Sequence, residues 1–275
     1  GYDLAGIKSE KVDNFLNVMQ HAQDSEIFKY CKEYLLEHID LFEKVTKEDI
    51  ENISGDICNS ATISTLHGCP PQEIERIAMH LITEKGFNTF IKCNPTLLGY
   101  EYARKTMDDM GYDYIAFGDF HFKDDLQYTD AVPMLQRLMA VCQERNLEFG
   151  VKITNTFPVD VKQNELPSEE MYMSGKSLYP LSISVANMLA RDFDGKLRIS
   201  YSGGADFHNI EGIIDAGIWP VTVATTILKP GGYDRMAQIA PLLEKENAVF
   251  EKVDPEKTAK LVEEAKVSPY HVKAV

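Results

Sequence analysis

The 275-residue sequence contains 43 acidic and 28 basic residues, which gives a net charge of −15 at pH 7. A surface this acidic repels nucleic acid and anionic lipid, so we expect neither a nucleic acid nor a membrane as a partner. The hydrophobic fraction of 44% is enough for a sizeable core, and the length is ordinary for one β/α barrel.

The cysteines lack the spacing of a metal site. There are five and no CxxC pair, at Cys31, Cys58, Cys69, Cys93 and Cys142. This pattern predicts neither an iron–sulfur cluster nor a structural zinc site within the chain. Because no apolar run approaches the ~20 residues that span a bilayer and no signal peptide is present, we expect a cytoplasmic protein with reduced thiols.

The segment before residue 56 is predicted to be mostly helical. Apolar residues recur at helical spacing over Lys11–His21 and Ser25–His38, and Thr46 is a typical cap for a helix over Thr46–Asn52. The sequence opens without an initiator Met and stops without a terminal signal. We therefore interpret it as an excised part of a larger protein.

From residue 56 onward, strand-like segments alternate with amphipathic helices. The predicted strands cover residues 56–66, 88–94, 112–118, 147–156, 195–202 and 219–226, and a long loop is predicted over 157–175. This alternation is typical of parallel strands joined by crossover helices. With no dinucleotide-binding fingerprint in the sequence, it favours a barrel over an open sheet.

A closed barrel of this type needs eight strands. We therefore expect an incomplete TIM-type (β/α) barrel over residues 1–250, with the first two βα units outside this chain. Residues 251–275 are charged and lose their periodicity. We expect them to form a helix or linker toward a downstream domain.

The predicted strand ends are unusually polar. In a parallel barrel the carboxyl ends of the strands form the mouth where active sites lie. The candidates there are Lys92, Asn94, Lys152, Asn155, Thr156 and Ser202, with His67 and His121 as possible proton donors or metal ligands. Neither histidine has a second ligand at metal spacing, so we predict no metal site.

Two consecutive strand ends have the composition of a phosphate site. Ser202-Gly203-Gly204 follows one strand, and Ala224-Thr225 ends the next. Glycines let backbone N–H groups approach a phosphate, and a helix N-terminus adds its positive end. The alternative is that the two glycines only make a tight turn.

These strings carry a family resemblance. VKITNT, SGKSLYP, SYSGGADFHN and AGIWPVTVATTI, in this order, resemble the FMN barrel of dihydroorotate and dihydropyrimidine dehydrogenases. STLHGCPPQEIE, NPTLLGYE, TNTFPVDV and SGGADFHNI resemble the N-terminal barrel of the putative selenate reductase subunit family, over nearly the whole chain. The resemblance implies FMN in this barrel. It also implies, as partners in the same protein, downstream iron–sulfur and FAD/NAD(P) domains that hold FAD and 4Fe-4S clusters and are not in this chain.

The resemblance also implies site residues. Gly203 and Gly204 match one half of the flavin-phosphate site, and Ala224 and Thr225 match the other half. The implied cofactor-binding set is Lys92, Lys152, Asn155, Gly175, Ser202, Gly203, Gly204, Ala224 and Thr225, with Asn94 and Thr156 as substrate-binding residues.

Two cysteines compete for the acid–base role that the dehydrogenases place in a loop after the fourth strand. Strand counting selects Cys93, and local similarity selects Cys69, which precedes a helix N-terminus that would lower its pKa. The same count puts the flavin-contacting lysine of the fifth strand within residues 116–122, which contain none. Lys92 and Lys152 lie one strand to either side.

Three functions remain open. The first is a flavin-dependent oxidoreductase domain that acts on a small heterocyclic substrate within a multidomain iron–sulfur flavoprotein. The second is a flavin-free scaffold or docking barrel in an oxidoreductase complex. The third is a lyase that uses Lys92 or Lys152 to form a Schiff base.

Overall fold

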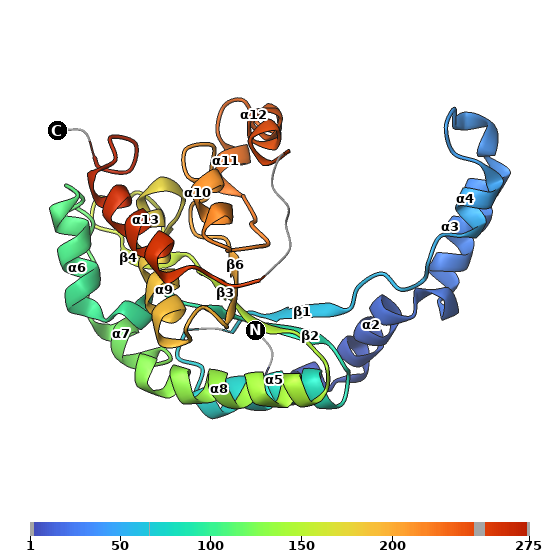
Figure 1. The fold of residues 1–275 in the computed structure, drawn as a ribbon, viewed down its shortest axis with the longest axis horizontal. Helices are drawn as coiled ribbons and strands as arrows, with labels where there is room; N and C mark the ends of the chain where they lie inside the picture. The colour runs from blue at the N-terminus through green and yellow to red at the C-terminus, as the bar shows by residue number, and fades with distance from the viewer. Residues whose placement is uncertain (1–2, 66, 245–250, 274–275) are drawn as a thin grey trace.

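The computed structural model describes residues 3–65, 67–244 and 251–273. Its centre is a four-stranded parallel sheet in the order β1-β2-β3-β6 (Figure 1). The strands are β1 (Ser60–Ile63), β2 (Asn88–Cys93), β3 (Phe149–Ile153) and β6 (Arg198–Tyr201). Within the described ranges β1 pairs with β2 alone, so its other edge has no partner strand.

Helices cover the sheet. α5 (Pro71–Thr83) and α8 (Tyr128–Glu144) pack side by side along it, and α9 (Tyr179–Asp192) packs against β3 and α13 (Pro255–Val267) (Figure 1). α5 begins with a proline at its first turn, and its inward residues Ile74, Ile77 and Leu81 follow the helical period. This arrangement of parallel strands covered by helices therefore matches a partial TIM-type barrel.

The remaining helices have 12 residues or fewer. They are α1 (Leu4–Ile7), α2 (Glu10–Gln20), η1 (Ala22–Asp24), α3 (Glu26–Glu37), η2 (Ile39–Leu41), α4 (Lys47–Glu51), η3 (Pro95–Leu98), α6 (Tyr100–Asp109), α7 (Phe120–Asp124), η4 (Gly175–Ser177), α10 (Ile210–Asp215), α11 (Thr225–Leu228) and α12 (Asp234–Leu243). None of the helices in the described part of the chain has the length and apolar character that crossing a bilayer needs.

The three helices predicted before residue 56 are confirmed as α2, α3 and α4. They form an arm that extends away from the sheet (Figure 1). We call residues 10–51 the N-terminal arm. Thr46 caps α4 in a reciprocal arrangement with Asp49, as its sequence position predicts. Neither α2 nor α3 contains a buried residue, and Phe15 and Ile27 are 60% and 64% exposed. The arm therefore contributes little to the core.

One predicted strand is absent, and another is reduced to a single bridge. Residues 112–118 form turns instead of a strand, although Tyr112 and Phe117 are buried. Arg104 Nη1 donates a hydrogen bond to the Ile115 backbone oxygen at 2.7 Å, so a side chain bonds this carbonyl group. Residues 219–226 contribute only one bridge, between Tyr201 and Val221. The sheet therefore has four strands and this bridge, not six strands.

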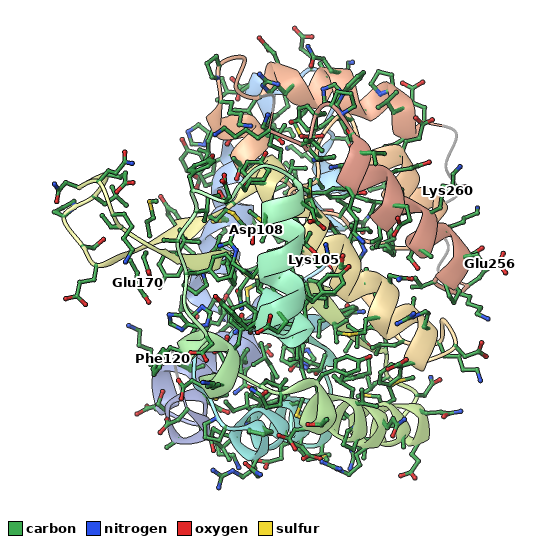
Figure 2. The ribbon with its side chains drawn as sticks, turned by 90° about the vertical axis from the view of Figure 1, so that its left-hand side faces the viewer. Lys105, Asp108, Phe120, Glu170, Glu256 and Lys260 are labelled. Carbon is green, nitrogen blue, oxygen red and sulfur yellow. The ribbon has the colours of Figure 1, made fainter. Side chains whose placement is uncertain are left out.

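The long loop predicted over 157–175 contains a hairpin. β4 (Phe157–Asp160) pairs with β5 (Glu170–Met173) in antiparallel fashion, and the hairpin projects from the body in Figure 2. Phe157 and Met173 join the buried Phe117 and Phe122 in a second apolar cluster. The apolar residues of the false strand therefore pack under this hairpin.

The C-terminal helix packs on the barrel. Val262 and Ala265 of α13 are buried, and they belong to the same apolar cluster as the sheet. Asp254 caps the helix by accepting hydrogen bonds from the N–H groups of Glu256 and Lys257. The helix that we expected within residues 251–275 is thus present and shares the core of the barrel.

Placing a carboxylate at the α9–α13 interface should destabilise the whole barrel. We expect Val262→Asp to lower the free energy of unfolding by about 3 kcal/mol, because it replaces a buried apolar side chain by a charge that must leave water. The matched change Glu263→Gln, at a side chain 77% exposed, should alter it by less than about 0.5 kcal/mol. Urea unfolding followed by circular dichroism measures both, and equal effects would contradict the packing of α13.

Candidate functional site

A cavity of about 250 Å³ lies at the carboxyl ends of β2, β3 and β6. Eight predicted site residues line it: Lys92, Lys152, Thr156, Gly175, Ser202, Gly204, Ala224 and Thr225. They come from five separate stretches of the sequence, which the parallel sheet brings to one edge. The sequence prediction missed two further lining lysines, Lys176 and Lys229.

Two of the lysines lie side by side across the sheet. Lys92 on β2 is in register with Lys152 on β3, so their side chains leave the same face of neighbouring strands. Both are half-buried, and neither has an ion-pair partner among the described residues. Burial lowers the pKa of both amines, and the Lys92 charge lowers that of Lys152 further. The pair therefore offers positive charge that no carboxylate neutralises.

The rest of the lining adds to this positive character. Lys176 lies in η4 and Lys229 directly follows α11, so both approach the cavity from its loops. Asp206 is the acidic residue among the lining residues, and its carboxylate already accepts hydrogen bonds from the Tyr270 hydroxyl and the His208 N–H. In a protein of net charge −15, a cavity lined by four lysines suits an anionic ligand.

Glycines allow the loops around the cavity to approach one another. Gly204 has φ +83°, and a Cβ there would lie 2.2 Å from the Gly175 carbonyl oxygen. Gly175 itself has φ +69° and abuts the Thr225 side chain. Gly203 does not line the cavity, because its Cβ position faces the Ser182 hydroxyl behind the loop. The Gly-Gly turn is therefore needed for close packing at the cavity wall.

A second polar cluster surrounds Asp125, which follows α7. Its buried carboxylate accepts hydrogen bonds from the Gly68 N–H at 3.0 Å, the Thr96 hydroxyl at 2.7 Å and the Asn94 amide at 3.0 Å, and it pairs with His67 Nδ1 at 2.9 Å. Burial alone would raise the pKa of Asp125, but the hydrogen bonds from His67, Thr96 and Gly68 outweigh it and hold the pKa below its ordinary value. The Asp125 bond raises the pKa of His67, against the effect of burial.

Asn94 and Asn155 belong to this cluster and do not line the cavity. The Asn155 side-chain amide donates to the Asn94 oxygen at 2.6 Å, and the Asn155 backbone N–H donates to the Cys93 carbonyl at 2.9 Å. Asn155 stands between Thr154 and Thr156, which both line the cavity. The two asparagines therefore connect the cavity wall to Asp125.

The structure does not support a thiolate at either predicted cysteine. Cys93 is 3% exposed within the main apolar cluster, and burial raises its pKa to about 12. Burial and the Glu73 carboxylate also raise the pKa of Cys69. The pKa of Cys69 is therefore raised, opposite to the direction expected from the helix N-terminus.

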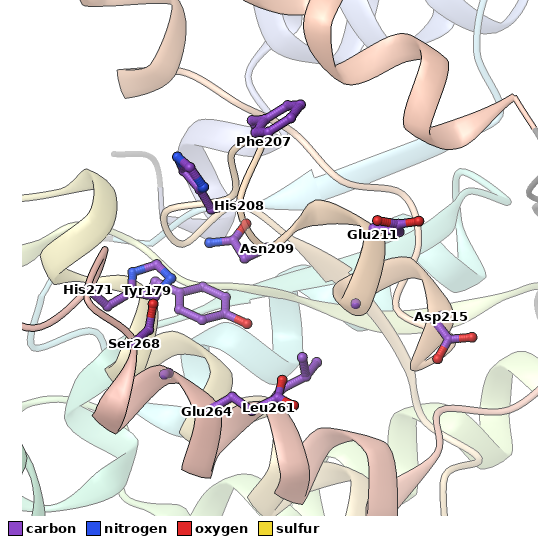
Figure 3. Close-up of a pocket in the computed structure, with 12 residues that line it drawn as sticks. Tyr179, Phe207, His208, Asn209, Glu211, Asp215, Leu261, Glu264, Ser268 and His271 are labelled. Carbon is purple, nitrogen blue, oxygen red and sulfur yellow. The ribbon is translucent and has the colours of Figure 1, made fainter.

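A larger pocket of about 540 Å³ lies between α10 and α13 (Figure 3). Its polar wall carries the carboxylates of Glu211, Asp215 and Glu264, together with His208 and His271. None of the predicted site residues lines it. Across the described ranges, no group of three or more His, Cys, Asp or Glu side chains is arranged to hold a metal ion.

Thiol labelling should separate the cysteines. At pH 8 we expect iodoacetamide to label the exposed Cys31 quickly and Cys93 at least ~100-fold more slowly, since burial and a raised pKa both suppress the thiolate. Peptide mass spectrometry of timed samples measures both rates, with urea-unfolded protein as the control in which the rates converge. Fast labelling of Cys93 in folded protein would restore it as a candidate nucleophile.

The lysine pair should cost stability while the cavity holds no anion. Replacing Lys152 by Met removes the repulsion from Lys92, so we expect the free energy of unfolding to rise by about 0.5–1 kcal/mol. The gain should shrink as the pH rises toward the pKa of the lysines, because both then lose their charge. Lys105→Met, at a side chain 75% exposed, is the control that should show no such gain in thermal unfolding at pH 7.

Two comparisons identify the family. Residues 1–273 match the family model described as oxidoreductase YgfK, N-terminal TIM-barrel domain. The chain is 44% identical over 284 residues to the "Putative oxidoreductase YgfK" of Escherichia coli strain K12, and equally to that of strain O157:H7. Each alignment covers 98% of this chain and 27% of the relative, so the chain spans about a quarter of the length of these relatives. The chain therefore belongs to the family of N-terminal TIM-barrel domains of the oxidoreductase YgfK.

Proposed function

We propose that this oxidoreductase domain binds FMN in the lysine-lined cavity and uses it to oxidise or reduce a small heterocyclic substrate. The observation that carries the proposal is the Lys92–Lys152 pair, which has no counter-ion in the described residues and opens into a cavity lined by Ser202, Gly204 and Thr225. FMN is an anion through its phosphate, and it would supply the redox chemistry of the site.

The corrected strand count supports this proposal. Because residues 112–118 are not a strand, β3 is the next strand after β2 both in the sequence and in the sheet. The strand after the one that carries Cys93 therefore carries Lys152, at the place where the FMN barrels that the sequence resembles have their flavin-contacting lysine. This position supports the assignment of Lys152 as the flavin-contacting lysine.

The residues present fit a phosphate and an attached flavin. Ser202 and Thr225 offer hydroxyls, and the tight approach of Gly204 to Gly175 keeps side chains out of the cavity wall. Lys176 and Lys229 would balance the charge of the phosphate, while Lys92 and Lys152 would face the electron-rich part of the cofactor. At about 250 Å³ the cavity is smaller than ordinary ligand pockets, which begin at about 300 Å³, so part of the cofactor would lie outside its open mouth.

The longer protein provides the context for the reaction. The relatives are nearly four times as long as the matched region, and the resemblance to the selenate reductase subunits implies FAD and 4Fe-4S domains there. We propose that these domains exchange electrons with the flavin of the barrel. We also propose that the protein is cytoplasmic.

Flavin content tests the proposal directly. Full-length protein purified under anaerobic conditions should carry one FMN, and Lys152→Met should weaken FMN binding roughly 10- to 100-fold, as the loss of a charge-assisted hydrogen bond predicts. Thr225→Val should weaken it less, and Lys105→Met should not change it. Fluorescence of released flavin, with FMN and FAD separated by chromatography, measures each protein. An unmutated protein without FMN would favour the scaffold function.

One observation favours a second function. The lowered pKa values of Lys92 and Lys152 would increase the fraction of free amine, which a Schiff-base lyase requires. Borohydride reduction in the presence of a carbonyl compound would then trap a covalent adduct on one of these lysines. Trapping in a protein that holds no FMN would select the lyase over the oxidoreductase site.

A further inference from the structure

Two histidines that do not line the cavity are each held by a carboxylate. His67 pairs with Asp125 through Nδ1 at 2.9 Å, and His121 pairs with Glu170 through Nε2 at 2.7 Å. The two imidazole rings are neighbours, with centroids 5.0 Å apart. Glu170 lies on β5 of the projecting hairpin, next to α7, which carries His121 (Figure 2). The hairpin and α7 thus bring two acid-paired histidines together.

His67 has the geometry of a proton-transfer group. Its partner Asp125 has a side chain 1% exposed and is fixed by donors from the Gly68, Asn94 and Thr96 positions, so the carboxylate cannot turn away. With Nδ1 occupied by Asp125, Nε2 is the ring nitrogen without a partner in the described part of the chain. The His67 side chain is 22% exposed and therefore reachable.

The location of His67 also suits catalysis. It follows β1, so it belongs to the same edge of the sheet as Lys92 and Lys152, where a barrel has its active site. Asn155 and Asn94 link the cavity wall to Asp125 by the hydrogen bonds described above. The Asn94 amide nitrogen lies 3.4 Å from His67 Nδ1, so the hydrogen-bonded pair Asn94–Asn155 separates His67 from the cavity wall.

We propose that His67 is the catalytic proton donor and acceptor of this site and that Asp125 is its positioning residue. The assignment rests on the proposed flavin-dependent function. A bound flavin would supply the hydride chemistry at one carbon of a substrate double bond, and the role of His67 Nε2 would be to give its proton to the other carbon. The π bond breaks, two bonds to hydrogen form, and the imidazole regains its proton from solvent. Oxidation follows the reverse course.

The charges around His67 favour its protonated form. The groups that face it are Asp125, Asp124 and Glu170, together with the ring of His121. The three carboxylates stabilise the imidazolium, which agrees with the raised pKa of His67. A proton donor of this kind is active below its pKa, so the rate of reduction should fall as the pH rises through that value. Without the Asp125 carboxylate the fall should occur at lower pH.

The test uses full-length protein with bound FMN, and uracil and orotate as trial oxidants of the reduced flavin. General acid–base catalysis contributes about 10²–10⁴-fold, so we expect His67→Gln to lower the rate of flavin reoxidation under argon at least 100-fold. FMN content and melting temperature should stay unchanged. Asp125→Asn should move the pH limb to lower pH. His21→Gln, which alters an exposed histidine 3.8 Å from the Asp56 carboxylate, is the matched control and should keep the full rate.

The outcomes separate this assignment from the function on which it rests. A His67→Gln protein that keeps its rate within threefold, or an Asp125→Asn protein with an unmoved pH limb, would overturn the role of His67 and leave FMN binding intact. A protein that binds no FMN, or whose reduced FMN reacts with neither compound, would overturn the proposed function and the assignment with it. If Asp125→Asn fails to fold, Thr96→Val removes one donor to the carboxylate, which leaves more of its charge for His67 and should shift the same limb to higher pH by a smaller amount.

Discussion

Parallel pairing of β2 with β3 forces two lysine side chains onto the same face of adjacent strands, and much of the site is organised around that constraint. The register that pairs Lys92 with Lys152 is fixed by the apolar residues before them, because Ile91 and Val151 must face the helices. Two like charges half-removed from water are unfavourable without an anion. This unfavourable pair lies at the edge of the sheet where loops surround a cavity that can hold a ligand.

The neighbouring Asp125 does not relieve the lysines. Its carboxylate is already occupied by His67, Thr96, Asn94 and the Gly68 N–H. A carboxylate saturated in this way has little capacity left to act as a counter-ion. The mouth is therefore divided into a positive cavity and a neutralised histidine cluster, joined through Asn155. Such a division keeps a region for binding an anion apart from a region for moving protons.

The sequence predicted which residues line the cavity better than it predicted the sheet. Polar residues at strand ends identify the mouth, since parallel strands share one carboxyl edge, and most of the predicted residues do line the cavity. The strand over 112–118 failed because a run of aromatic and aliphatic residues also occurs where a turn packs under a hairpin. The His67–Asp125 pair was out of reach, since it depends on a contact between residues 58 positions apart. No local pattern marks Asp125 as a partner.

The free side of β1 has a consequence for handling the protein. A closed barrel has no edges, whereas this sheet ends in a strand whose outer N–H and C=O groups have no strand partner within the described ranges. Such an edge is a template for another strand, and the exposed apolar residues of the adjoining arm add to its tendency to self-associate. Material consisting of these residues alone should therefore become less soluble as its concentration rises. Soluble preparations will depend on whatever covers that edge.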